Sequence, residues 1–239
     1  MAGLRGGTIP RPAGPEPDNA GGGSMARLDP RTLGVYVVTS GGSVTGRNHR
    51  TIVAAAVEGG ATAVQLRAPE LADDELLPLA MSSTRECAEA GIPLLVNDRV
   101  EIAVGVGAAG AHVGQGDDPA TARGRLGPER ILGVSVGNAE DVWVAEMAGA
   151  DYLGVTVWAT GTKPEAVPIG LEGLRDITAA TALPVVGIGG IHVGNARDVL
   201  AAGATGIAVI GAVATAEDPT EAVRELRALV DAFQEERSG

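Results

Sequence analysis

The sequence predicts an α/β fold, a closed (β/α)8 TIM barrel, from three features of the chain. Short apolar segments, the pattern of parallel strands buried on both faces, occur eight times. Helical patterns follow most of these segments, and four of the helices end in glycine just before the next strand. Eight such units within about 210 residues favour a closed barrel over an open doubly wound sheet.

The expected elements follow one another in a regular order along the chain. The predicted strands are residues 35–38, 63–66, 93–96, 111–113, 131–136, 152–157, 184–188 and 206–210. The clearest predicted helices are residues 73–90, 139–148, 195–202 and 219–233, while residues 102–109 have only a weak helical pattern. We expect residues 28–239 to form this one domain, and the Gly- and Pro-rich residues 1–27 to be a disordered leader.

Composition narrows the classes of partner. The chain carries 18 basic and 30 acidic side chains, a formal net charge of −12, which disfavours nucleic acids and anionic membranes as partners. Aromatic residues make up 2% of the chain, too few for a surface that stacks bases. The single cysteine, Cys87, excludes an internal disulfide and fits a reducing compartment such as the cytoplasm. The expected partners are therefore small molecules, and the sequence leaves a homo-oligomer open.

Two short motifs indicate a phosphate site. Thr160, Thr162 and Lys163 follow the strand predicted at 152–157, and a run of glycines at 187–190 ends the strand after it. Glycine leaves backbone N–H groups open to close approach, and lysine supplies a positive charge. At the carboxyl ends of barrel strands, this combination suits a small phosphorylated ligand.

Polar residues follow most of the other predicted strands as well, at the end of a barrel where active sites form. The candidate site residues at these strand ends are Thr39, Ser40, Gln65, Arg67, Asn97, Asp98, Gln115, Asp117, Ser135 and Gly211. Two carboxylates, Asp98 and Asp117, without a histidine cluster suit Mg²⁺ and do not suit zinc. A purely structural interpretation as helix caps also stands for Asp98 and for Asp117 or Asp118, since Asp is favoured at N-caps and Pro119 follows at the first helical position.

These residues lie in motifs whose order and spacing resemble one family. The motifs are V-Q-L-R, V-N-D-R-V-E-I-A, G-A-H-V-G-Q-G-D, I-L-G-V-S, A-T-G-T-K-P and V-V-G-I-G-G-I, and the resemblance runs from about residue 35 to 218. Together they resemble the thiamine-phosphate synthases. That family joins a hydroxymethylpyrimidine diphosphate to a thiazole phosphate and releases pyrophosphate.

The resemblance implies a role for each matching residue on the pyrimidine side. Gln65 and Arg67 would hold the pyrimidine substrate and its diphosphate, with Asn97 beside them. Asp98 and Asp117 would ligate Mg²⁺.

The resemblance also implies which residues carry the chemistry. Arg67, Ser135 and Lys163 would stabilise the departing pyrophosphate. Ionisation to a resonance-stabilised pyrimidine-methyl cation depends on charge stabilisation of the leaving group more than on a general base. A site without a catalytic histidine is therefore physically reasonable.

The second substrate would be held at a separate phosphate site. The resemblance assigns it to Thr160, Thr162 and the amide of Gly190, completed by the backbone of Ile210 and Gly211. Gly211 stands where the family commonly has a serine, and its amide could still serve.

A further departure from the family pattern keeps two alternatives open. Pro69 stands where the family usually has a lysine, which removes one positive charge expected near the diphosphate. One alternative is a thiazole tautomerase, which would need a proton-transfer side chain in place of a metal site. Pro69 argues for it, and the pair Asp98 and Asp117 argues against it. The other is a repurposed phosphate-binding barrel.

The three histidines are expected to be structural or exposed. His112 lies within a predicted strand and is interpreted as a hydrogen-bonded core residue. His49 and His192 are expected to face solvent.

Overall fold

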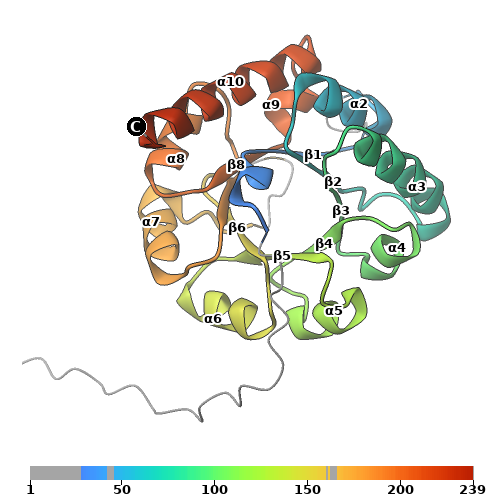
Figure 1. Ribbon diagram of the computed structural model, residues 1–239, viewed down its shortest axis with the longest axis horizontal. Coiled ribbons are helices and arrows are strands. Elements are labelled where there is room, and N and C mark those ends of the chain that lie inside the picture. Colours follow the sequence, from blue (N-terminus) through green and yellow to red (C-terminus); the bar gives the residue numbers. More distant parts are fainter. Residues whose placement is uncertain (1–27, 42–45, 160, 162–165, 239) are drawn as a thin grey trace, which may run out of the picture.

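The computed structural model describes residues 28–41, 46–159, 161 and 166–238, and these form a closed barrel of eight parallel strands (Figure 1). Each strand pairs with the next, and the last pairs with the first. The strands are β1 (Val35–Val38), β2 (Ala63–Leu66), β3 (Leu94–Asn97), β4 (Gly110–Val113), β5 (Ile131–Val136), β6 (Tyr152–Thr156), β7 (Val185–Ile188) and β8 (Gly206–Val209). The predicted TIM barrel is confirmed.

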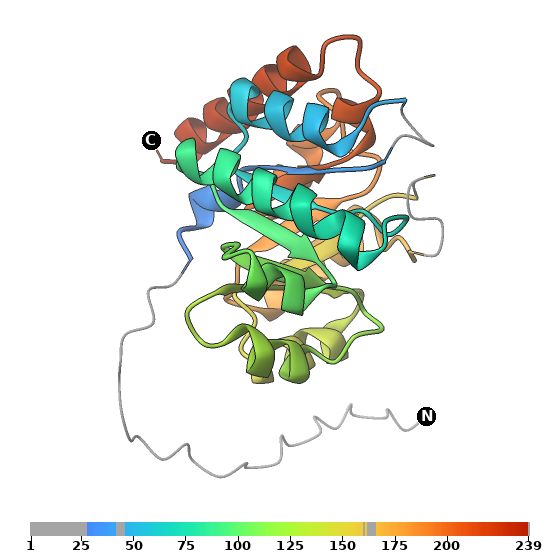
Figure 2. The ribbon, with the colours of Figure 1, turned by 90° about the vertical axis from the view of Figure 1, so that its right-hand side faces the viewer.

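Helices surround the barrel on its outside (Figure 1). They are α2 (His49–Gly59), α3 (Asp73–Glu89), α4 (Val100–Gly105), α5 (Pro119–Leu126), α6 (Ala139–Met147), α7 (Gly170–Ala180), α8 (Ala196–Ala201), α9 (Gly211–Ala214) and α10 (Pro219–Ser238), and the short helix η1 (Pro30–Leu33) lies apart from this ring. The loops that follow the strands gather at one end of the barrel, at the right of Figure 2, and η1 lies at the other end. The predicted leader, residues 1–27, lies outside the described residues.

Most predicted segments agree with the structure to within one residue at each end, and two helices differ by more. The weak helical pattern at 102–109 overlaps a helix, α4, which begins two residues earlier at Val100 and ends at Gly105. The last helix, α10, continues five residues beyond the predicted end at residue 233. This long helix packs against both α2 and α8.

The apolar residues divide into two cores because strand side chains alternate in direction. Val35 and Val37 belong to the core between the strands and the helices. Tyr36 and Val38 belong to the core inside the barrel, where Leu33 of η1 joins them. Each fully buried side chain of this size stabilises the fold by roughly 1.5–3 kcal/mol.

One glycine makes room for Tyr152, one of the two tyrosines inside the barrel. Tyr152 is fully buried, and a Cβ placed on Gly133 would lie 2.2 Å from its Cζ atom. The residue on β5 must therefore lack a side chain for the Tyr152 ring to cross the barrel interior. This ring and that of Tyr36, in edge-to-face contact with centroids 6.0 Å apart, close the barrel below the mouth.

Among the described helices, none is long and apolar enough to cross a membrane.

Candidate active site

A cavity of about 550 Å³ opens at the end of the barrel where the strands finish, and all eight strands contribute to its lining. Of the candidate residues that the structure describes, these line it: Gln65, Arg67, Asn97, Asp98, Asp117, Ser135, Gly190, Ile210 and Gly211. The candidates Thr39, Ser40 and Gln115 do not: Thr39 and Ser40 are buried beside it, and Gln115 donates to Asp141. Thr160, Thr162 and Lys163 lie outside the described residues. Residues from β2 to β8 that are far apart in the sequence thus share one cavity.

The floor of the cavity is a chain of buried hydrogen bonds. Gln65 Nε2 donates to the Tyr36 hydroxyl at 2.8 Å, and the two tyrosine hydroxyls, of Tyr36 and Tyr152, lie 3.0 Å apart. His112 links Tyr152 to Ser135, with Nδ1 at 2.9 Å from the tyrosine oxygen and Nε2 at 2.9 Å from the serine oxygen. His112 is 9% exposed and hydrogen-bonded, as the sequence suggested, but it also lines the cavity.

One arrangement of protons gives each member of this chain a partner. In it Gln65 donates to Tyr36, Tyr36 donates to Tyr152, and Tyr152 donates to His112 Nδ1. His112 then donates from Nε2 to Ser135, whose own hydroxyl proton is left to donate to a ligand. Burial raises the pKa of both tyrosines well above the ordinary value, so both stay protonated donors.

Asp98 has the only positive φ, 60°, among the described residues that are not glycine. Such a conformation costs about 1–3 kcal/mol and persists where the surroundings hold it. Here the Asp98 N–H donates to the carbonyl of His112 across to β4 at 2.8 Å. The interpretation of Asp98 as a helix cap is wrong, because Arg99 takes the N-cap position of α4.

Asp117 and its neighbour Asp118 have different roles. Asp118 is the N-cap of α5 and accepts a hydrogen bond from the Ala120 N–H at 3.1 Å. Asp117 lines the cavity, and its Oδ2 accepts from the Gly114 N–H at 2.8 Å. The cap interpretation therefore applies to Asp118 and is wrong for Asp117.

The two cavity carboxylates fit a magnesium ion. Asp98 and Asp117 follow the neighbouring strands β3 and β4, and both line the same cavity. Among the described residues, no group of three or more His, Cys, Asp or Glu side chains could hold a metal by itself. Mg²⁺ is commonly bound by one or two carboxylates while water and substrate phosphates complete its shell. The strained Asp98 backbone, which places this carboxylate at the cavity, agrees with such a use.

The opposite side of the cavity is made of backbone. Gly189 and Gly190 have φ values of 94° and 63°, which favour glycine, and a Cβ on Gly189 would lie 2.4 Å from the Trp158 carbonyl oxygen. Gly190, Ile210 and Gly211 line the cavity there. A Cβ on Gly211 would meet nothing within 4 Å, so the site has room for the serine common in related sequences.

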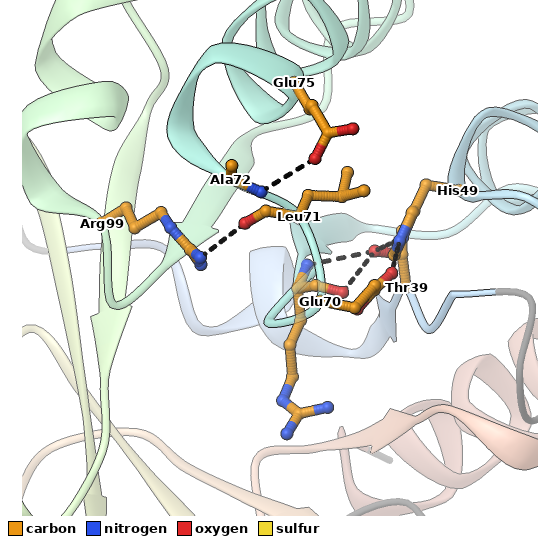
Figure 3. A network of polar contacts seen from close by, with 8 residues as sticks. Thr39, His49, Glu70, Leu71, Ala72, Glu75 and Arg99 are labelled. Atoms are coloured by element: carbon orange, nitrogen blue, oxygen red, sulfur yellow. Dashed lines mark hydrogen bonds and ion pairs between the residues drawn. The ribbon is translucent and has the colours of Figure 1, made fainter.

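The expectation that His49 faces solvent is wrong, whereas the exposed position of His192 is confirmed. His49 is 6% exposed and is bonded to Thr39 and Glu70, which follow β1 and β2 (Figure 3). Tyr36, Tyr152 and this buried His49 are the site residues that sequence reasoning missed.

Residues 35–213 match the family described as thiamine monophosphate synthase. A thiamine-phosphate synthase of Chloroflexus aurantiacus is 48% identical over 203 residues, which cover 84% of this chain and 94% of the relative. One from Moorella thermoacetica is 50% identical over 199 residues, covering 82% and 95%. Among solved structures, a thiamine phosphate pyrophosphorylase from Pyrococcus furiosus superposes with a TM-score of 0.78 at 38% identity, covering 85% of this chain and 98% of that one.

Proposed function

The chain belongs to the thiamine monophosphate synthase family, and we propose that its barrel mouth joins a hydroxymethylpyrimidine diphosphate to a thiazole phosphate with release of pyrophosphate. The observation that carries this assignment is the cavity itself. It has two carboxylates and an arginine on one side and open glycine backbone on the other. That division suits two phosphorylated substrates that meet in the middle.

The diphosphate substrate belongs on the β2–β4 side. Gln65 and Asn97 offer amide groups to the pyrimidine ring, and Arg67 offers a planar guanidinium to the diphosphate. Asp98 and Asp117 would hold Mg²⁺, which when bound offsets part of the negative charge of the diphosphate.

Bond breaking depends on how well the leaving group is stabilised. The C–O bond to the pyrimidine methylene breaks, and its electron pair leaves with the pyrophosphate. Hydrogen-bond donors that are already oriented toward the leaving oxygens stabilise the transition state more than donors that must reorganise. Ser135 would be such a donor when His112, 2.9 Å from its oxygen, donates to it and leaves the serine proton for a phosphate oxygen. The thiazole partner then supplies the electron pair of the new bond, and no catalytic base is needed for the ionisation.

The thiazole phosphate belongs on the β7–β8 side. The amide of Gly190 and the backbone of Ile210 and Gly211 are placed to hold it. By family resemblance we include Thr160 and Thr162 in this assignment, and we assign Lys163 to the departing pyrophosphate; all three lie outside the described residues. A thiazole tautomerase would not require the two cavity carboxylates, which favours the synthase.

The test is pyrophosphate release measured with both precursors and with each alone, over a titration of Mg²⁺. Release should require both precursors and the metal ion. Thiazole isomerisation without pyrophosphate release would support the tautomerase alternative. No turnover of either kind at saturating substrates and Mg²⁺ would support the repurposed barrel.

A further inference from the structure

His49 is a buried histidine beside the loop that carries Arg67, and the proposed reaction does not use it. It is the first residue of α2, directly after the N-cap Asn48, a position that is often exposed in a surface helix. Its ring lies between two polar groups from different loops. Nδ1 is 2.8 Å from Thr39 Oγ1, and Nε2 is 2.7 Å from Glu70 Oε1 (Figure 3).

Thr39 extends this contact to the backbone of Arg67. The Arg67 N–H donates to Thr39 Oγ1 at 3.0 Å, and Thr39 is fully buried. The chain of contacts therefore runs from Arg67 through Thr39 and His49 to Glu70. Because Arg67 and Glu70 are three residues apart on the loop after β2, the contacts close into a ring, which we call the Arg67–Thr39–His49–Glu70 ring.

Each proton in the ring has a place. Thr39 has one hydroxyl proton, and its 2.8 Å contact with His49 Nδ1 is shorter than its 3.3 Å contact with the Arg67 carbonyl. A carboxylate only accepts hydrogen bonds, so His49 donates from Nε2 to Glu70, 2.7 Å away. Burial acts to raise the pKa of Glu70, but the hydrogen bond from His49, a backbone hydrogen bond, and the charges of His49 and Arg67 together lower it.

A glycine lies directly against the ring. A Cβ on Gly41 would lie 1.9 Å from Glu70 Oε1 and 3.1 Å from His49 Nε2. The Glu70 carboxylate thus packs directly against the backbone of Gly41, and any larger residue there would displace it.

The far end of the same loop is also held. Arg99, which follows Asp98, donates from Nη2 to the Leu71 carbonyl at 2.9 Å and from Nε to Asp73 at 2.8 Å. Glu75 accepts from the Ala72 N–H at 3.1 Å, at the start of α3 (Figure 3). The segment between Arg67 and Ala72 is therefore held on one side by α2 and on the other by the loop after β3.

We propose that His49, through Thr39 and Glu70, is a positioning residue that fixes the backbone from which Arg67 reaches the diphosphate. The inference rests on the proposed function, which gives Arg67 that ligand. Among the described residues that line the cavity, Arg67 is the only lysine or arginine, and Pro69 stands where the family usually has a second cation. A single guanidinium must be placed accurately, since a displacement of about 1 Å at a reacting group can cost roughly 100-fold in rate.

The test compares His49→Gln with the parent enzyme in steady-state pyrophosphate release, varying each substrate in turn. A glutamine cannot bridge Thr39 and Glu70 as the imidazole does. We expect kcat/KM for the pyrimidine diphosphate to fall about tenfold, which is part of the loss available from a misplaced reacting group. The KM for the thiazole phosphate should be unchanged, because its proposed site is on the other side of the cavity.

Glu75→Ala is the matched control. It removes a carboxylate from the same loop end and weakens the start of α3, but it leaves the ring intact. Its cost should be confined to the melting temperature. Glu70→Gln keeps an acceptor for His49 and should lose less than Glu70→Ala. If His49→Gln does not fold, Glu70→Ala opens the same ring from the protein surface and Gly41→Ala opens it from its buried side, and both carry the same expectation.

A double-mutant cycle decides whether the effect passes through Arg67. In an Arg67→Ala background, His49→Gln should have almost no further effect on kcat/KM for the diphosphate, whereas independent sites would add. Additive losses, or equal losses for both substrates, would overturn the positioning role. If the parent itself releases no pyrophosphate, the proposed function fails and the inference falls with it. If the parent is active and His49→Gln matches Glu75→Ala, the inference alone fails.

Discussion

The loops after β1, β2 and β3 are held by side chains, whereas the loops after β7 and β8 present glycine backbone to the cavity. On the first side, Thr39, His49 and Glu70 brace Arg67 through hydrogen bonds between residues distant in the sequence. On the second side, Gly189 and Gly190 adopt positive φ values within one short motif. A side-chain site can lose one contact and keep its backbone, while a glycine site loses its backbone geometry with one substitution.

The carboxylates should give the largest effect and show whether the first side depends on charge. Asp98→Asn and Asp117→Asn should each lower kcat by at least about 100-fold, since a metal-bound leaving group is worth several kcal/mol. Pyrophosphate release over a Mg²⁺ titration measures it. Asp118→Ala is the control, because it should cost about 1 kcal/mol of helix capping and leave turnover intact. If Asp98→Asn keeps the parental rate and Mg²⁺ requirement, the metal ion does not bind at Asp98 and Asp117.

The glycine side should respond to a single methyl group. Gly190→Ala should raise KM for the thiazole phosphate about tenfold, because φ of 63° is strained for alanine and the amide would shift. The KM for the diphosphate should stay near the parental value. Gly107→Ala, at φ of 69° and with nothing within 4 Å of the new Cβ, measures the cost of the strain alone. Equal changes in both KM values would mean that the two sides are not separate.

The floor connects the two sides, and its hydrogen bonds should have a smaller effect on rate. Tyr152→Phe removes the hydroxyl that joins Tyr36 to His112 and should destabilise the fold by about 1–3 kcal/mol. It should also lower kcat a few-fold, since His112 no longer has a fixed partner on Nδ1 and Ser135 is less well oriented. Thermal unfolding and single-turnover kinetics measure the two effects.

Tyr36→Phe is the matched variant for the floor. It removes a buried tyrosine hydroxyl from the same chain but leaves the contacts of Tyr152, His112 and Ser135 in place. Its stability loss should be similar and its kcat closer to the parent. Equal losses of kcat in both variants would show that the floor acts only through packing.

The smallest expected effect is a gain. Pro69 lines the cavity and is exposed, and Pro69→Lys should raise kcat/KM for the diphosphate two- to threefold or lower the Mg²⁺ requirement, since a partly solvated charge contributes about 0.2–1 kcal/mol. Pro69→Ala separates the added charge from the loss of the proline ring. If Pro69→Lys and Pro69→Ala behave alike, the missing cation has no consequence on this side.

The difference between the two sides also explains what the sequence could predict. The barrel, the strand ends and the glycine motif depend on patterns within a few consecutive residues, and the structure contains them as expected. His49 was misjudged because its burial depends on Glu70 reaching it across Gly41, a contact that no local pattern contains. Tyr36 and Tyr152 were missed for a related reason. In a strand they look like ordinary core residues, and only the closed barrel brings their hydroxyls together.

Gly133 and Tyr152 limit which amino-acid substitutions the barrel floor can accept. A side chain at residue 133 would collide with the tyrosine ring, and a small residue at 152 would leave a hole beside a glycine. Either single change lowers stability before it can alter the shape of the floor. An exchange of volume between the two strands must therefore pass through a destabilised intermediate, or happen at both positions together. Any remodelling of this pocket for a larger ring, by selection or in the laboratory, is expected to begin from the pair and not from either residue alone.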